Sequence, residues 1–328
     1  MQLVIHPIDR TLSVSPGANL LEVLREHDVP ISYSCTAGRC GTCRCKVTRG
    51  SVLESGSQMQ GTRVNQGQHV LACMSVLTES CEIEVPEPDE VVIHPARVVK
   101  ATVTAIEDMT HDIKRIVLRP AKPLSFSPGQ YAQIQFMPEH SRPYSMASLP
   151  SDEELEFHVR LVHDGRVSGY IASELAVGQS VRVSGPLGTA YLREKHTGPM
   201  LCVASGTGLA PILSIVRGAL QAGMANPIYL YFGARSPRDV YGMHWLEELA
   251  HDHSNLSVQV VTTSGATGQM RSGLVTDAIA SDWGNNLKDF RAYLCGSPSM
   301  VEAATLLLKQ RGISPEHVYA DAFYPIGQ

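Results

Sequence analysis

The spacing of four cysteines constrains the fold of this chain more than any other feature of its sequence. They are Cys35, Cys40, Cys43 and Cys73. The first three share one short segment, and they can bring their thiolates to one centre only if the backbone turns sharply there. Gly38 and Gly41 permit such a turn. We therefore expect a tight loop that meets a later segment around one group of sulfur ligands.

This Cys-x4-Cys-x2-Cys pattern with a distant fourth cysteine is typical of plant-type [2Fe–2S] ferredoxins. Two irons bridged by two sulfides need two thiolates each, and glycines in the loop let amide groups approach the sulfides. A structural zinc site is the alternative, because four thiolates also suit tetrahedral zinc. Zinc sites usually pair two short cysteine hooks, whereas Cys73 stands alone here. The sequence therefore predicts a [2Fe–2S] cluster.

Composition and charge exclude several classes of protein. A chain of 328 residues is too long for one ordinary domain. Its 32 acidic and 27 basic residues give a net charge of -5, which argues against nucleic-acid binding. Pro7 interrupts the start of the chain before a signal sequence could form, and no apolar run is long enough to cross a bilayer. We expect a cytoplasmic protein with no membrane or nucleic-acid partner.

Residues 1–92 form the first predicted domain. Gln2–Ile5 and Thr11–Val14 alternate apolar and polar residues and predict a hairpin, and Asn19 is placed to cap a following helix. The polar, proline-rich segment Pro86–Glu90 marks the end of this domain. The cysteines outside the cluster pattern are expected to be small buried apolar residues; they include Cys45, Cys81 and Cys202.

Residues 98–195 form the second predicted domain, a small antiparallel barrel, because short β-like runs alternate with turn residues there. These runs are Val99–Ile106, Ile113–Arg119, Gln130–Phe136, Leu155–Val162 and Ser180–Ser184. In residues 198–328, β-like runs alternate with helical stretches instead, which predicts a parallel, doubly wound sheet. Those runs are Met200–Ala204, Ile228–Gly233, Ser257–Thr263, Arg291–Cys295 and His317–Asp321.

Three further motifs occur in these two regions. They are Arg-Pro-Tyr-Ser at 142–145, Gly-Thr-Gly-Leu-Ala-Pro at 206–211 and Cys-Gly-Ser-Pro at 295–298. With the cysteine pattern and the order of the three regions, they resemble the ferredoxin-fused members of the ferredoxin–NADP⁺ reductase superfamily, in particular the reductase components of bacterial aromatic-ring dioxygenases. The resemblance covers essentially the whole chain. It implies a β-grasp ferredoxin domain, an antiparallel Greek-key FAD barrel and a Rossmann-like nicotinamide domain.

The resemblance assigns the first motif to a flavin. Arg142 can pair with the pyrophosphate of FAD, Tyr144 offers a flat face to the isoalloxazine, and Ser145 can hydrogen-bond near N5. A helix start beyond the next strand would hold the phosphates. The further cofactor-binding residues that the resemblance implies are His158, Arg160, Gly165, Val167 and Ser168. An exposed arginine, a core tyrosine and ordinary barrel surface are the alternative interpretation, and FMN is a lesser alternative to FAD.

The other two motifs are assigned to the nicotinamide coenzyme. Gly206, Thr207 and Gly208 lie between a predicted strand and a helix, where amides can meet a pyrophosphate, although a routine strand-to-helix turn would look similar. The resemblance implies that Cys295 and Gly296 lie beside the nicotinamide. It also places the aromatic ring of Phe323 near the flavin. A buried cysteine and a core phenylalanine are the alternatives.

The preferred coenzyme depends on the residues that follow the second strand of the third region. Arg235, Ser236 and Arg238 could accommodate a 2′-phosphate, whereas an inward-pointing Asp239 would favour the ribose hydroxyl of NADH. We predict a preference for NADH with some tolerance of NADPH.

The predicted activity is that of an NAD(P)H-dependent reductase. A hydride passes to FAD, and single electrons then pass to the cluster and on to a separate ferredoxin, expected to be of the Rieske type, which feeds a ring-hydroxylating dioxygenase in aromatic catabolism. Arg39, Arg44 and Lys46 predict a basic docking surface, unless they form only a solvated face. The alternatives are direct donation to a terminal oxygenase or di-iron hydroxylase, a passive redox carrier or sensor, and a zinc-stapled interaction protein.

Overall fold

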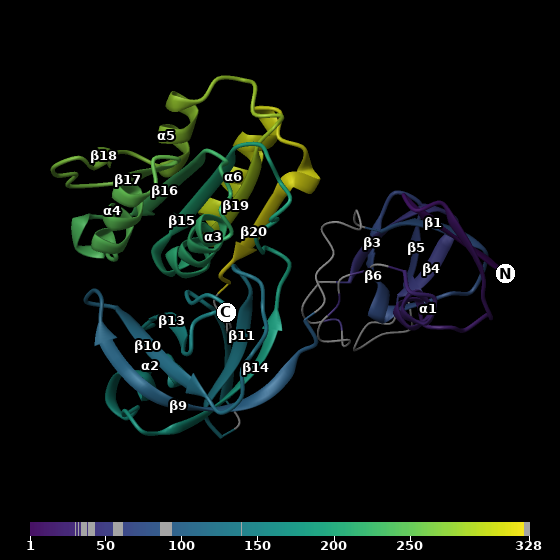
Figure 1. Cartoon of the computed structure of the whole chain (residues 1–328), viewed down its shortest axis with the longest axis horizontal. Coiled ribbons are helices and arrows are strands. Elements are labelled where there is room, and N and C mark those ends of the chain that lie inside the picture. The colour runs from purple at the N-terminus through teal and green to yellow at the C-terminus, as the bar shows by residue number, and fades with distance from the viewer. Residues whose placement is uncertain are drawn as a thin grey trace. The chain divides into compact units, whose positions relative to one another are not determined.

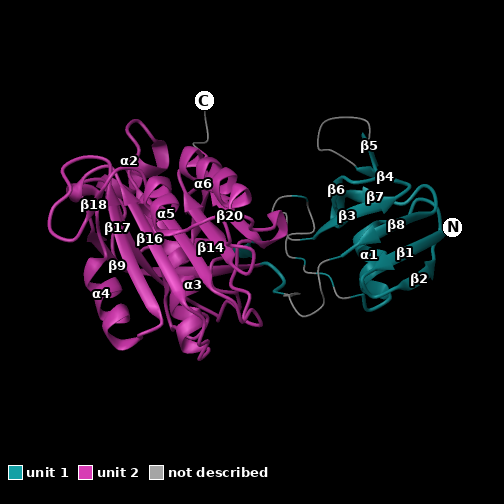
Figure 2. Ribbon diagram, turned by 90° about the horizontal axis from the view of Figure 1, so that it is seen from above, with its two compact units in different colours: residues 1–96, 185–189 teal, residues 97–184, 190–328 magenta. Residues whose placement is uncertain are grey.

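The computed structural model describes residues 1–29, 31, 33, 38, 43–54, 62–85, 94–138 and 140–324. The chain forms two compact units, which Figure 2 distinguishes by colour. Unit 1 comprises Met1–Ala96 with Gly185–Thr189, and unit 2 comprises Arg97–Ser184 with Ala190–Gln328. The proline-rich segment Pro86–Glu90, predicted as a boundary, lies outside the described residues.

Unit 1 is built on a five-stranded sheet in the order β2-β1-β8-β3-β6, with a smaller sheet in the order β5-β4-β7. Its elements are β1 (Gln2–His6), β2 (Arg10–Ser13), α1 (Leu20–Glu26), β3 (Arg44–Arg49), β4 (Ser51–Glu54), β5 (Thr62–Asn65), β6 (His69–Leu71), the 3₁₀ turn η1 (Ala72–Met74), β7 (Ser75–Val76) and β8 (Cys81–Glu84). The predicted hairpin is confirmed, because β1 and β2 pair antiparallel. β1 also pairs with β8 in parallel.

Helix α1 covers this sheet with its apolar face. The side chain of Asn19 accepts a hydrogen bond from the Glu22 amide, which confirms the predicted cap. Leu20 and Leu24 are fully buried in the same core as Leu3 of β1. Burial of each such leucine contributes about 2 kcal/mol, so α1 is held chiefly by packing. The core also contains the side chains of two cysteines predicted to be buried, Cys45 and Cys81.

The first part of unit 2 is a nearly closed antiparallel barrel with strand order β12-β11-β14-β9-β10-β13. Its elements are β9 (Arg97–Asp108), β10 (Ile113–Pro120), β11 (Tyr131–Met137), β12 (His140–Ser145), β13 (Leu155–Arg160), α2 (Arg166–Ser173) and β14 (Ser180–Leu187). A bridge between Met146 and Phe157 brings the two edges of the sheet together. All five predicted strands are present, and β12, which the sequence did not predict, carries the Arg-Pro-Tyr-Ser motif.

The second part of unit 2 is a wholly parallel sheet in the order β18-β17-β16-β15-β19-β20, as predicted for a doubly wound fold. Its elements are β15 (Met200–Ser205), η3 (Gly206–Gly208), α3 (Leu209–Gln221), β16 (Ile228–Ala234), η4 (Pro237–Asp239), α4 (Met243–Asp252), β17 (Leu256–Thr262), β18 (Arg271–Ser272), α5 (Val275–Asp282), β19 (Arg291–Gly296), α6 (Pro298–Gln310), η5 (Pro315–His317) and β20 (Val318–Ala322). Figure 1 shows helices on both faces of this sheet.

Side chains of β15 alternate between the two faces of the sheet. Cys202 packs into the core under α3, which confirms its predicted burial, whereas Leu201 and Val203 pack into the core shared with α5 and α6. The strand order reverses between β15 and β19, so the loops after these strands diverge at the carboxyl edge of the sheet. Such a switch point is where open α/β sheets bind their ligands. Among the described residues, no helix has the length and apolar character needed to cross a bilayer.

Candidate functional site

Two of the predicted cluster ligands, Cys43 and Cys73, are adjacent in unit 1. The Cys73 amide donates to the Cys43 sulfur at 3.4 Å, and the Gly38 amide donates to the Cys73 sulfur at 3.3 Å. The interaction with Cys43 and these amide donors lower the pKa of the Cys73 thiol. Amide donors and an acidified thiol fit the thiolate ligands of an iron–sulfur cluster. Cys35 and Cys40 lie outside the described residues, as does Arg39.

The fold of unit 1 holds this cysteine pair from two directions. Asn19 caps α1 and also donates from its side chain to the Cys73 carbonyl at 2.9 Å. Gly38 has a φ of +72°, and a Cβ there would lie 2.8 Å from the Met74 side chain. The positive φ therefore favours glycine at this position, where its amide reaches Cys73.

Unit 2 contains a cavity of about 1070 Å³ between the barrel strands and the carboxyl edge of the parallel sheet. Its volume is at the upper end of the usual range for small-molecule sites. Most residues predicted from the second and third regions line its wall. They are Arg142, Tyr144, Ser145, His158, Arg160, Gly165, Val167, Ser168, Gly206, Thr207, Arg235 and Phe323.

Strand β12 supplies the polar wall of the cavity on the barrel side. Arg142 and Tyr144 are two residues apart and therefore project from the same face of the strand. Tyr144 packs edge-on against Phe136 at 5.8 Å, and burial raises the pKa of its phenol to about 12. The ring is thus neutral and fixed in place. Across the cavity, Gly165 caps α2, whose first turn presents Val167 and Ser168.

The Ser145 hydroxyl donates to an Asp321 carboxylate oxygen on β20 at 3.3 Å. Burial raises the pKa of Asp321 to about 6. This carboxyl group lines the cavity, a position that the sequence did not predict for it. The sequence feature that could have indicated this position is an acidic residue near the carboxyl end of a strand of the parallel sheet. Phe323 lies two residues further on, and its amide donates to the Gly296 carbonyl at 2.8 Å, which holds Phe323 beside β19.

Glycines allow the two loops at the switch point to pack against each other. A Cβ on Gly208 would lie 2.0 Å from the Cys295 carbonyl oxygen, and one on Gly296 would lie 2.3 Å from the Ser205 hydroxyl. Gly206, with a φ of +53°, lies under the Arg160 guanidinium. No side chain larger than hydrogen fits at Gly208 or Gly296 without moving the backbone.

Five predicted residues do not line the cavity, namely Gly208, Ser236, Arg238, Cys295 and Gly296. The two glycines contribute through the backbone packing of their loops. The Cys295 side chain is fully buried in the core beneath α3, and burial raises its pKa well above the ordinary value. The thiol at this position is therefore neutral and faces away from the cavity.

The turn after β16 shows how Asp239 is oriented. One of its carboxylate oxygens accepts hydrogen bonds from the Ser236 amide at 3.0 Å and from the Ser236 hydroxyl at 2.6 Å. Burial alone would raise the pKa of Asp239, but these hydrogen bonds hold it below the ordinary value. Its other oxygen lies 3.9 Å from His111. Asp239 thus caps its own turn and accepts a hydrogen bond from the Ser236 hydroxyl, and both Asp239 and Arg235 line the cavity.

Three models of known protein families match successive parts of the chain. They describe a 2Fe-2S iron–sulfur cluster binding domain at residues 3–78, an oxidoreductase FAD-binding domain at 100–191 and an oxidoreductase NAD-binding domain at 202–305. These matches confirm the predicted cofactors and the order of the three modules. The sites in unit 2 fit such cofactors, because the cavity combines an arginine, a fixed aromatic ring and glycine loops at a helix start.

Individual proteins resemble this chain over its full length. The ferredoxin–NAD(P)(+) reductase component of a naphthalene 1,2-dioxygenase system from Pseudomonas putida is 59% identical to this chain over 328 residues, which is 100% of each chain. The crystal structure of an Amycolatopsis cytochrome P450 reductase matches with a TM-score of 0.73 at 31% identity, covering 99% of each chain. A ferredoxin reductase in carbazole 1,9a-dioxygenase matches with a TM-score of 0.67 at 26% identity, covering 98% of each chain.

The raised pKa of Asp321 predicts a pH-dependent stability of unit 2. Its folded-state pKa of about 6 exceeds the ordinary value of 3.8. Stability from this group is therefore fully present below about pH 4 and is lost as the pH rises through about 6. Asp321→Asn removes that loss, so the stability of the variant relative to the native chain should increase between pH 4 and 7, by on the order of 1 kcal/mol.

Urea unfolding followed by tryptophan fluorescence measures this effect, because both tryptophans, Trp245 and Trp283, lie in unit 2. Asp289→Asn is the matched control, since Asp289 is exposed. A relative stability of Asp321→Asn that does not change with pH would contradict the assignment.

Proposed function

We propose that this chain oxidises NADH and reduces a Rieske-type ferredoxin. It belongs to the family of FAD- and [2Fe–2S]-containing ferredoxin–NAD(P)⁺ reductases of oxygenase systems. The Rieske-type ferredoxin would feed a ring-hydroxylating dioxygenase of aromatic catabolism. The observation that carries the proposal is the shared cavity of unit 2, whose wall combines the flavin motif of β12 with the glycine loop of β15. The cytoplasm, where NADH is available, is the compartment we propose.

FAD, when bound, accepts two electrons as a hydride and releases them one at a time to an iron–sulfur cluster. We assign its pyrophosphate to Arg142 and to the first turn of α2, with Gly165, Val167 and Ser168. Tyr144 would pack against the isoalloxazine, because its neutral ring is already fixed by Phe136. Phe323 would cover the ring from the end of the chain.

Ser145 and Asp321 are the polar pair that we place at the reacting edge of the cavity. The hydroxyl of Ser145 joins the Asp321 carboxyl to the cavity wall. Because burial raises the pKa of Asp321 to about 6, this carboxyl can hold or release a proton near neutral pH. A group that can hold a proton here suits a reaction in which a hydride arrives in one step and the electrons leave singly in later steps.

The coenzyme would bind at the switch point. Gly206 and Thr207 line the cavity at the start of α3, where amides favour a pyrophosphate. Cys295 and Gly296 would border the nicotinamide through their backbone, since the Cys295 side chain is buried. Arg160, held by Asp112 at 3.3 Å, lies over Gly206 and would face the phosphates.

The acceptor is proposed to be a separate ferredoxin because the Pseudomonas putida relative is the reductase component of a dioxygenase system whose name specifies ferredoxin. Direct donation to an oxygenase is the second candidate, because the Amycolatopsis relative is a cytochrome P450 reductase. Arg44 directly follows Cys43 and is exposed, so it is placed to meet an acidic partner beside the cluster. Lys46 lies 3.9 Å from Glu84, which reduces its availability.

Anaerobic titration with NADH tests the internal electron path. The native protein should lose flavin absorbance and then give the EPR signal of a reduced [2Fe–2S] cluster. Arg142→Ala should bind FAD at least about tenfold more weakly, because a charge-assisted hydrogen bond is lost. Arg182→Ala, at an exposed position of β14, is the matched control. Bleaching without the EPR signal would contradict the cluster, and a protein that binds no flavin would overturn the proposal.

Coenzyme preference follows from the turn after β16. We expect a higher kcat/KM for NADH than for NADPH, and Arg235→Ala should lower kcat/KM for NADPH about tenfold while changing that for NADH little. Arg238→Ala is the control, because Arg238 does not line the cavity. Steady-state kinetics with both coenzymes measure this. A large advantage of NADPH in the native enzyme would refute the preference.

Docking through Arg44 predicts a salt-dependent reaction with the ferredoxin. Arg44→Glu should lower kcat/KM for an acidic Rieske-type ferredoxin about tenfold at low ionic strength, and the deficit should shrink as salt is added. Arg49→Glu, at the other end of β3, controls for charge alone. Reduction of ferricyanide should be unaffected in both variants. Salt-insensitive turnover would exclude the docking surface, and oxygenase reduction without ferredoxin would favour direct donation.

A further inference from the structure

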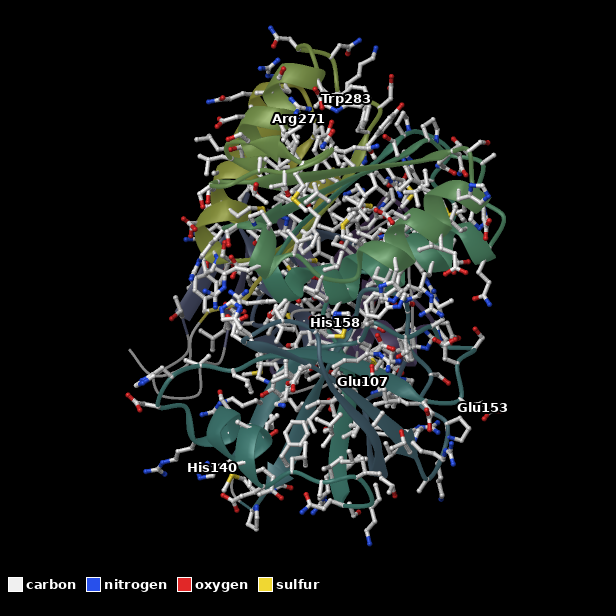
Figure 3. The ribbon with its side chains drawn as sticks, turned by 90° about the vertical axis from the view of Figure 1, so that its left-hand side faces the viewer. Glu107, His140, Glu153, His158, Arg271 and Trp283 are labelled. Carbon is white, nitrogen blue, oxygen red and sulfur yellow. The ribbon has the colours of Figure 1, made fainter. Side chains whose placement is uncertain are left out.

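His158 occupies a buried position between the two layers of unit 2, and both of its ring nitrogens have protein partners. Figure 3 labels it where the barrel meets the parallel sheet. Its side chain is 0% exposed. Nδ1 lies 2.9 Å from the Tyr241 hydroxyl, and Nε2 lies 3.0 Å from a Glu156 carboxylate oxygen. The ring also stacks on Trp245 at 5.8 Å. A histidine bonded on both sides acts on the cavity through its partners.

Glu156 determines the state of one ring nitrogen. Arg115 donates to its second oxygen at 2.6 Å and is itself paired with Glu107 at 3.1 Å. Burial alone would raise the pKa of Glu156, but the hydrogen bonds from His158 and Arg115 lower it to about 2. The carboxylate is therefore an acceptor only, and Nε2 of His158 must carry a proton.

Tyr241 faces two acceptors with one proton. Its oxygen lies 3.4 Å from the Gly206 carbonyl oxygen as well as 2.9 Å from His158 Nδ1. When Nδ1 has no proton, the phenol donates to His158 and Gly206 loses this donor. When Nδ1 is protonated, it donates to the phenol oxygen and the phenol proton is available to Gly206. In that second arrangement, each of the four hydrogen-bonded groups, from the Glu156 carboxylate through His158 and Tyr241 to the Gly206 carbonyl, has a hydrogen-bond partner.

The orientation of the Gly206 carbonyl determines the orientation of the next amide in the loop. Gly206 is in the left-handed region, and both it and Thr207 line the cavity. Because the peptide unit is planar and trans, fixing the Gly206 carbonyl also fixes the Thr207 amide, which points the opposite way. A hydrogen bond from Tyr241 would therefore orient an amide of the loop to which we assign the coenzyme pyrophosphate.

We propose that His158 is a positioning residue for the nicotinamide coenzyme: with both ring nitrogens protonated, it directs the Tyr241 hydroxyl onto the Gly206 carbonyl and so holds the loop for binding. This inference rests on the proposed assignment of Gly206 and Thr207 to the coenzyme. It gives His158 a role through Tyr241 instead of direct contact with a cofactor.

Several charged or titratable groups lie around His158 and Tyr241. The pH dependence of coenzyme binding alone would therefore not identify which group changes its protonation. On the barrel side and in the turn before β10 they are Glu107, Asp112, Arg115, Glu156 and Arg160, and on the sheet side they are Asp239, Tyr241 and His244. Variants of the pair itself are therefore needed to assign any pH dependence.

The test uses the FAD-containing holoenzyme and compares Tyr241→Phe with the native chain. In Tyr241→Phe, KM for NADH and Kd for NAD⁺ should both be raised about fivefold relative to the native enzyme at the same pH, because one hydrogen bond to the loop is lost. The change in kcat should be much smaller. Tyr229→Phe is the control, since Tyr229 packs with Trp283 and Phe290 away from this site.

Nitrogen-15 NMR of histidine-labelled holoenzyme provides a readout that does not depend on turnover. His158 should show two protonated nitrogens in the NAD⁺-bound holoenzyme, and the assignment can be made with His158→Asn. A singly protonated ring in that complex would overturn the proposal. A Tyr241→Phe enzyme with the native KM for NADH and the native Kd for NAD⁺ would also overturn it.

Gly208→Ala separates this inference from the coenzyme site itself. The added Cβ would meet the Cys295 carbonyl oxygen at 2.0 Å and displace the loop. If this variant folds and binds NAD⁺ normally, the assignment of the loop to the coenzyme is wrong, and the inference falls with it. If it loses NAD⁺ binding while Tyr241→Phe behaves as the native enzyme, only the role of His158 is wrong.

Discussion

The close approach of two backbone loops at the switch point of the parallel sheet is the constraint on which the cavity of unit 2 depends. The loop after β15 packs against the end of β19 with Gly208 facing the Cys295 carbonyl and Gly296 facing Ser205. A methyl group at either glycine would push the loops apart. The carboxyl ends of these strands and the start of α3 then form one wall, and Phe323 is fixed to that wall by the Gly296 carbonyl.

Polar groups on this wall are satisfied largely within the protein, which gives the cavity a defined shape. Asp239 accepts two hydrogen bonds from Ser236, and Asp321 accepts one from Ser145. A buried polar group without a partner would cost about 1 to 3 kcal/mol, so these pairs stabilise the folded state as well as the site. The contact between Ser145 and Asp321 joins β12 of the barrel to β20 of the sheet. A ligand that binds between them would meet groups that are already oriented.

The sequence predicted the fold and much of the cavity wall, because these depend on local patterns. Runs of β-like residues identified most strands of both layers, and the Arg-Pro-Tyr-Ser motif identified Arg142 and Tyr144, although β12, the strand that carries them, was not predicted. The sequence did not predict the contact of Asp321 with Ser145, 176 positions away, or the contact of His158 with Tyr241, 83 positions away. Such pairs carry no local signal. The motif at Cys295 marked the end of a strand, but the structure was needed to show that its side chain faces the core.

The cysteine pair and the cavity belong to different units of the chain. Cys43 and Cys73 belong to a unit with its own hydrophobic core, and the groups that contact them, Asn19 and Gly38, come from the same unit. The cavity residues of unit 2 are held by the barrel and the parallel sheet. The amide donors to Cys43 and Cys73 therefore belong to unit 1, whereas the glycine loops that shape the cavity wall belong to unit 2.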